Sequence, residues 1–261
     1  MDIGTAKVGA ADQARVPHHG LDIVDPDVRF TAADFRRHAL GVLRGIAARG
    51  HRAVLVGGTG LYLRAVARGL PMDTTGYDPL VRDELEARLE SEGLPSLLDE
   101  LRSLAPNAYA RVDQANHRRV IRAIERARRD GDVPPPAPEG YPASAVWLGL
   151  TVEPDRHLRA IETRVREQFC GGLLDEAAGL RDRYGEDLRP FGAMGYREAF
   201  DVLAGRSTTD AAVSRTAERT RSYASRQRTW FRAEPEMHWL MDGPDVVGRA
   251  LAHIHRVWGH D

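Results

Sequence analysis

The chain has 261 residues, enough for one large domain or for a domain that carries an insertion. Its apolar content of 42% and charged content of 29% are those of an ordinary globular protein, and no apolar run approaches the roughly 18 residues that cross a membrane. The N-terminus has no secretion signal, and the single cysteine, Cys170, cannot form an internal disulfide, so we expect a cytoplasmic protein.

The first part of the chain alternates apolar runs with helical patterns. The runs at 21–24 and 53–56 predict buried parallel strands, and a helix is expected between them at 31–48. A glycine turn at 57–60 then leads into another helix at 61–67. Strand, glycine turn and helix in this order predict an α/β fold built on a parallel sheet.

From residue 71 the sequence changes in character. Residues 78–130 are charged and helix-patterned, and the prolines of 133–138 indicate a stiff connector. We therefore predict a helical insertion at 71–139, within an α/β core formed by 1–70 and 140–261.

The last part of the chain returns to the core. Strands are expected at 145–150 and 237–241. Helices are expected at 154–169, 173–184, 193–204, 208–232 and 244–257.

The turn Gly57-Gly58-Thr59-Gly60 places backbone N–H groups and a hydroxyl at the start of a helix, where an anion or a substrate can bind. Glycines in such a turn also serve backbone geometry alone, and both interpretations stay open. The turn is not a Walker A loop, because Gly-Lys-Ser/Thr occurs nowhere in the sequence.

Arginine supplies nearly all the positive charge, since Lys7 is the only lysine in the sequence. One helical face of the insertion carries four arginines at spacings of four, four and three: Arg118, Arg122, Arg126 and Arg129. Such a row can follow a phosphate backbone, and the alternative is an ordinary solvated surface.

A second basic stripe lies in the last long helix. Its arginines are Arg215, Arg219, Arg221, Arg226, Arg228 and Arg232. Tyr223, Gln227 and Trp230 share a face of this helix, and that face is predicted to pack in the core in preference to stacking on bases.

His18 and His19 are adjacent and point to opposite sides of an extended chain, so we expect no metal site there.

Several segments, in chain order, resemble the tRNA dimethylallyltransferases, also called tRNA isopentenyltransferases. The most specific are Met-Asp-Ile-Gly-Thr-Ala-Lys at 1–7, Val-Gly-Gly-Thr-Gly-Leu-Tyr at 56–62, Arg-Arg-Val-Ile-Arg-Ala-Ile-Glu at 118–125, Met-Gly-Tyr-Arg-Glu at 194–198, and 220–232. The resemblance implies transfer of a dimethylallyl group from its diphosphate to N6 of the adenosine 3′ of the anticodon, in tRNAs that read codons beginning with U. It also implies a P-loop-kinase-like sheet, a helical insertion that grips the anticodon stem-loop, a requirement for Mg²⁺, and a monomer without a membrane anchor.

Position by position, the resemblance implies roles for individual residues. Thr59 approaches the target nucleotide, and Arg164 holds the diphosphate in the catalytic channel together with Thr5 and Lys7. The implied tRNA contacts are Thr59, Arg82, Arg118, Arg119, Arg122, Ser225, Arg226, Gln227, Arg228 and Trp230. Ser225 stands where the family usually has lysine, and Arg228 where it has an apolar residue, so one phosphate contact is lost and another gained.

In this family the motif at 1–7 follows a phosphate-binding loop and a catalytic aspartate. We therefore expect the first strand, the P-loop, the first helix and the general base to be missing from residues 1–261. Three hypotheses follow: an active transferase whose gene begins upstream of Met1, a truncated tRNA-binding remnant without catalysis, and an enzyme that prenylates free AMP. The arginines of the insertion argue against the third.

Overall fold

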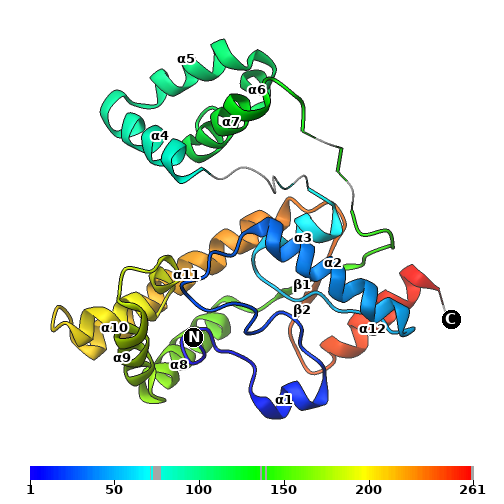
Figure 1. The fold of residues 1–261 in the computed structure, drawn as a ribbon. Helices are drawn as coiled ribbons and strands as arrows, with labels where there is room; N and C mark the ends of the chain where they lie inside the picture. Colours follow the sequence, from blue (N-terminus) through cyan, green and yellow to red (C-terminus); the bar gives the residue numbers. More distant parts are fainter. Residues whose placement is uncertain (71, 73–77, 136, 139, 260–261) are drawn as a thin grey trace. The chain divides into compact units, whose positions relative to one another are not determined.

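The computed structural model describes residues 1–70, 72, 78–135, 137–138 and 140–259 (Figure 1). These residues form two compact units. The first contains Met1–Thr31, Phe35–Leu63 and Tyr141–Asp261, and the second contains Ala32–Asp34 and Arg64–Gly140. None of the described helices is long and apolar enough to cross a membrane.

The first unit combines a small sheet with many helices. Its sheet pairs β1 (Trp147–Thr151) with β2 (Met237–Met241) in parallel, with Trp147 opposite Met237 and Thr151 opposite Met241. Its helices are α1 (Ala10–Arg15), most of α2 (Ala32–Ala48), the start of α3 (Gly60–Ala67), α8 (Pro154–Cys170), α9 (Leu173–Tyr184), the 3₁₀ helix η1 (Arg189–Gly192), α10 (Tyr196–Leu203), α11 (Thr209–Arg232) and α12 (Val246–Trp258).

Two predicted strands are wrong. Residues 21–24 and 53–56 are irregular, and the side chains of Val54 and Val56 are 87% and 85% exposed. An apolar run becomes a strand only when neighbouring backbone satisfies its N–H and C=O groups, and β1 and β2 are the only strands in the described residues. The short helix α1 was not predicted, because its sequence has no apolar stripe.

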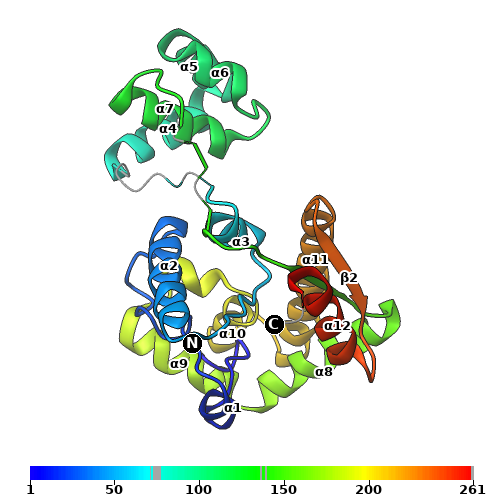
Figure 2. The ribbon, with the colours of Figure 1, turned by 90° about the vertical axis from the view of Figure 1, so that its right-hand side faces the viewer.

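The core of the first unit lies among α8, α9, α10 and α11, which Figure 2 shows as neighbours. Its buried side chains include Ile161, Val165, Phe169, Leu173, Phe191, Tyr196 and Phe200. Along α8 the buried positions recur at spacings of four, as expected for one helical face. Glu153 begins this helix, because its carboxylate accepts hydrogen bonds from the backbone N–H groups of Asp155 and Arg156 at 3.1 and 2.8 Å.

The second unit is mainly a group of four helices: α4 (Pro79–Glu92), α5 (Leu94–Leu104), α6 (Pro106–Arg111) and α7 (His117–Asp130). The break between α4 and α5 falls at Gly93 and α6 begins at Pro106, whereas 112–116 between α6 and α7 contain neither glycine nor proline. Asn116 caps α7 by accepting a hydrogen bond from the N–H of Arg119 at 3.3 Å, and Gly131 ends it at a φ of +76°. Buried Leu85, Leu97, Leu101, Val120, Ile121 and Ile124 form the core of this unit.

Candidate functional site

The glycine turn before α3 lies against the C-terminal half of α11. The side chain of Gln227 donates a hydrogen bond from Nε2 to the carbonyl oxygen of Gly58 at 3.1 Å. A Cβ atom added at Gly60 would overlap the indole ring of Trp230. Two segments about 170 residues apart in the sequence therefore meet at this turn, and the predicted contacts Thr59, Gln227 and Trp230 are brought together.

Glycine is needed at this turn for close approach as well as for flexibility. Gly60 is buried under the Trp230 ring, and a Cβ at Gly58 would overlap the side-chain amide of Gln227. Thr59 between them is exposed, and its carbonyl oxygen accepts the first helical hydrogen bond of α3, from Tyr62 at 2.9 Å. The exposed Thr59 hydroxyl thus lies at the N-terminal end of a helix, where backbone N–H groups favour negative charge.

The face of α11 with Tyr223, Gln227 and Trp230 is half-buried, and the predicted core packing applies to only part of it. Trp230 packs on Gly60 and makes an edge contact with Phe231, with ring centroids 4.9 Å apart. On the neighbouring face Ser225, Arg226 and Arg228 are exposed. An open hollow of about 480 Å³ lies beside them, lined by Ser222, Ser225, Arg226, Thr229 and Trp230.

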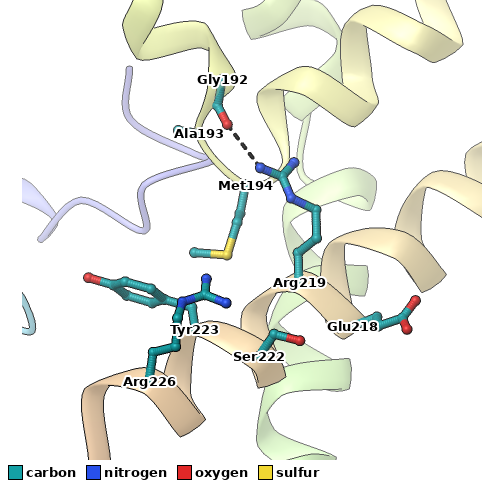
Figure 3. Close-up of a pocket in the computed structure, with 8 residues that line it drawn as sticks. All are labelled: Gly192, Ala193, Met194, Glu218, Arg219, Ser222, Tyr223 and Arg226. Atoms are coloured by element: carbon teal, nitrogen blue, oxygen red, sulfur yellow. Dashed lines mark hydrogen bonds between the residues drawn. The ribbon is translucent and has the colours of Figure 1, made fainter. Parts of the chain in front are cut away.

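A larger groove adjoins this hollow and shares Ser222 and Arg226 with it (Figure 3). It has a volume of about 610 Å³, and its walls are α11 and the segment 192–194. The guanidinium carbon of Arg226 lies 5.9 Å from the ring centroid of Tyr223, a cation–π arrangement. An aromatic face beside a cation can hold a flat group that carries negative charge.

One wall of this groove is fixed by a buried carboxylate. Glu198 is 4% exposed, accepts a hydrogen bond from the N–H of Gly195 at 2.9 Å, and forms an ion pair with Arg219. Arg219 also donates to the carbonyl oxygen of Gly192 at 3.0 Å, the dashed line in Figure 3. This arginine of the second stripe is therefore engaged in holding the segment before α10 onto α11.

The N-terminal turn is held by side chains from α8, α9 and α10. Glu176 accepts hydrogen bonds from the N–H groups of Ile3 and Gly4 at 3.0 and 3.3 Å and from the hydroxyl of Tyr196 at 2.9 Å. Gln168 donates to the carbonyl oxygens of the same two residues at 2.9 and 3.1 Å. Burial, together with the Glu176 carboxylate, raises the pKa of Tyr196, so its hydroxyl stays protonated as a donor.

The predicted diphosphate contacts are distributed over this turn and α8. The hydroxyl of Thr5 donates to the carbonyl oxygens of Met1 and Asp2 at 2.8 and 3.2 Å. Lys7 pairs with Asp2 and Asp22, and hydrogen bonds with these carboxylates raise the pKa of the lysine. Arg164 is exposed on α8 and makes no hydrogen bond or ion pair to any described residue.

The described residues do not assemble a ligand set for Mg²⁺. No three of their His, Cys, Asp or Glu side chains come close enough to hold a metal ion. At the N-terminal turn the Glu176 carboxylate is engaged by backbone N–H groups, and Asp2 and Asp22 both pair with Lys7.

The tRNA contacts predicted in the second unit lie on α4 and α7, and their side chains differ in the protein groups that they bind. Arg82 of α4 donates two hydrogen bonds to the buried carboxylate of Glu125, and Arg122 donates one to the same group. Arg119 lies 3.5 Å from Asp113, and both side chains are exposed. Arg118 is exposed and has no hydrogen-bond or ion-pair partner within the described residues.

The sequence profile of one family, the IPP transferases, matches residues 1–234. This match spans most of the chain. The chain belongs to the IPP transferase family.

Proteins similar to this IPP transferase carry a more specific name. One tRNA dimethylallyltransferase, from Geobacter sulfurreducens, is 43% identical over 246 residues, which are 92% of this chain and 79% of that protein. Another, from Halalkalibacterium halodurans, is 39% identical over 267 residues, covering 98% of this chain and 83% of that protein.

Solved structures agree with this family. The crystal structure of the tRNA isopentenylpyrophosphate transferase from Bacillus halodurans matches with a TM-score of 0.68 at 38% identity, covering 99% of this chain and 82% of that one. A eukaryotic dimethylallyltransferase, captured acting on tRNA, matches with a TM-score of 0.75 at 20% identity, covering 99% and 70%. The second likeness supports the fold alone.

Sequence reasoning missed the carboxylates that organise this transferase. Glu125, Glu176 and Glu198 each accept hydrogen bonds from groups distant in the sequence, and each is mostly buried. A buried acid needs such partners. The sequence shows only that a glutamate occupies a buried position of a helical pattern. It does not show which residue binds that glutamate.

Proposed function

We propose that this protein transfers a dimethylallyl group from dimethylallyl diphosphate to N6 of the adenosine 3′ of the anticodon, in tRNAs that read codons beginning with U. The observation that carries the proposal is the contact between the glycine turn and α11. It places the exposed hydroxyl of Thr59 beside Gln227 and Trp230, with the guanidinium of Arg226 on the neighbouring face of the same helix.

This arrangement suits an RNA base that has left its stack. An enzyme that modifies a base inside a stem-loop needs the base extruded, and aromatic and polar side chains then hold it. Thr59 and Gln227 supply a hydroxyl and an amide, while Ser225, Arg226 and Arg228 line the exposed side of α11 as contacts for the backbone. Family membership supports tRNA as the RNA in question.

In the proposed reaction the N6 nitrogen attacks the allylic carbon, the bond from that carbon to the diphosphate oxygen breaks, and N6 loses a proton to solvent or a base. Cations near the leaving group stabilise its charge. We propose Arg164, Thr5 and Lys7 as its contacts, although Lys7 must exchange a carboxylate partner for the diphosphate. We assign no general base among the described residues.

The same proposal includes properties expected of the family. The α/β unit would be P-loop-kinase-like, and its parallel pair β1 and β2, flanked by helices, is consistent with that fold. Magnesium would enter with the diphosphate, whose oxygens are typical Mg²⁺ ligands. In the second unit Arg82, Arg118, Arg119 and Arg122 would contact the anticodon stem-loop. The protein would act as a cytoplasmic monomer.

The test is a transfer assay with labelled dimethylallyl diphosphate, Mg²⁺ and an anticodon stem-loop RNA. We expect label on the adenosine 3′ of the anticodon, and none when that base is replaced by purine riboside, which lacks the amino group. EDTA should stop transfer. Failure to label the RNA would contradict the proposal, and preferential labelling of AMP in a mixture with the stem-loop would favour the AMP-prenylating enzyme.

A further inference from the structure

A buried carboxylate lies within the arginine-rich helix of the second unit. Glu125 is on α7, and its side chain is 3% exposed although its neighbours in sequence are largely basic. It follows buried Ile124 in the sequence and lies one helical turn after buried Ile121, so the helix brings this charge to the edge of the hydrophobic core. A buried carboxylate without compensation costs several kcal/mol, which makes its partners informative.

Two arginines provide the compensation. Arg82 donates from Nε to Oε1 of Glu125 at 2.8 Å and from Nη2 to Oε2 at 2.6 Å. Arg122 donates from Nη1 to Oε2 at 3.3 Å. The two-point contact fixes both the position and the plane of the Arg82 guanidinium, which a single contact would leave free to rotate.

Both guanidinium groups remain partly exposed while they are held in this way. The side chains of Arg82 and Arg122 are 22% and 37% exposed. Arg122 lies one helical turn from both Arg118 and Arg126. Glu125 thus joins the start of α4 to the middle of the arginine row on α7.

We propose that Glu125 is a positioning residue for RNA binding: it holds Arg82 and Arg122 in the orientation in which they meet phosphates of the stem-loop. The proposal rests on the function proposed above. Arginine loses considerable side-chain freedom when it binds a phosphate, and a guanidinium already fixed by a carboxylate loses less. A negative charge therefore strengthens binding to a negative ligand.

Positioning and simple electrostatic attraction predict opposite changes in RNA affinity when Glu125 loses its charge. The substitution Glu125→Gln removes one negative charge beside the arginine row, so simple electrostatic attraction predicts tighter RNA binding. Positioning predicts the opposite. A matched control is Glu84→Gln, because Glu84 pairs with Arg128 and Arg88 of the same unit and its loss changes the net charge equally.

The experiment measures stem-loop affinity and steady-state transfer for the wild type and both variants, below the melting transition of each as followed by circular dichroism. We expect Glu125→Gln to weaken RNA binding roughly tenfold, as for the loss of one charge-assisted contact, and Glu84→Gln to bind at least as tightly as the wild type. The KM for RNA should rise for Glu125→Gln while kcat at saturating RNA is unchanged. A general folding defect would instead lower the active fraction and therefore kcat.

A third variant tests whether Glu125 acts through the two arginines. In the background Arg82→Ala/Arg122→Ala, adding Glu125→Gln should not weaken binding further. Unchanged or tighter binding by the single variant Glu125→Gln would overturn the inference, as would a further loss in that background. If the wild type neither binds nor modifies the stem-loop, the proposed function itself fails, and that outcome is separate from either of these.

Discussion

The two arginine-rich helices, α7 and α11, have similar composition but are organised differently. On α7, acidic side chains from its own helix bundle surround one side: Arg128 pairs with Glu84 and Glu100, at 2.8 Å in each case. On α11 the arginine with a strong ion pair is Arg219, and the C-terminal half instead contacts the glycine turn through Gln227 and Trp230.

The difference shows that arginines on one helix can have different roles. Arg128 of α7 pairs with acids of its bundle, while Arg118 and Arg126 have no ion-pair partner among the described residues. The end of α11 shapes a site through an amide and an indole, with its cations on the adjoining surface. We therefore expect some arginine substitutions on α7 to lower the stability of the protein and others to lower its affinity for RNA. Substitutions around the contact between α11 and the glycine turn should lower the transfer rate.

The largest expected effect is from Gly60→Ala. The added Cβ would overlap the Trp230 ring, so the turn must move away from α11 and Thr59 with it. Overpacking of this kind costs about 1–3 kcal/mol of stability, and a displacement of about 1 Å at a reacting site lowers the rate by roughly 10²-fold. The measurement is the transfer rate at saturating RNA together with the thermal unfolding midpoint.

The matched control for this substitution is Gly57→Ala in the same turn. A Cβ at Gly57 would lie 3.7 Å from Cδ2 of Leu63, an ordinary contact. Its transfer rate should stay close to that of the wild type. Equal losses in the two variants would show that glycine flexibility, and not the approach of Trp230, is what the turn requires.

A second prediction separates the two kinds of arginine on α7. Arg118→Ala/Arg126→Ala should weaken stem-loop binding and reduce the slope of log K against log salt by about 1.5, because two phosphate contacts are lost. Its unfolding free energy should be unchanged. Arg128→Ala should leave that slope as in the wild type but lower the unfolding free energy by about 1–3 kcal/mol, because Glu100 loses a partner. The measurements are salt titrations of RNA binding and urea unfolding.

The sequence predicted most of this organisation wherever the signal was local. The breaks on either side of α5 fall at Gly93 and Pro106, and β2 coincides with the strand predicted at 237–241. The strands predicted at 21–24 and 53–56 failed because strand formation depends on partners, which an apolar run does not specify. Arg118 and Arg128 cannot be distinguished from sequence, since their difference depends on acids of α4 and α5.

A smaller effect is expected from Gln227→Leu. The substitution removes the hydrogen bond to the Gly58 carbonyl but leaves Trp230 in place on Gly60. A hydrogen bond of this kind contributes about 1 kcal/mol, so the transfer rate should fall by roughly fivefold. Arg228→Leu, one residue further along on the exposed side, should change RNA affinity and leave kcat unaltered. Single-turnover transfer at saturating RNA distinguishes the two.

The smallest effect concerns pH and the carboxylates that neutralise α7. Burial alone would raise the pKa of Glu100, but hydrogen bonds from Arg128 and Arg88 outweigh it and lower the pKa, and the hydrogen bond from Arg128 also lowers the pKa of Glu84. A carboxyl whose pKa is lower in the folded state contributes stability above its unfolded pKa, about 4.3 for glutamate. That contribution is lost as the pH falls through the folded value.

The wild type should therefore lose stability on acidification below about pH 4.3, and Glu84→Gln/Glu100→Gln should show a shallower loss while being less stable at neutral pH. Urea unfolding midpoints measured across this range test the expectation. Glu218→Gln is the control, because Glu218 on α11 has no ion pair among the described residues and its removal should leave the slope unchanged. Identical slopes for all three proteins would mean that the acids around Arg128 do not stabilise the bundle, and the contrast between α7 and α11 would then be one of geometry alone.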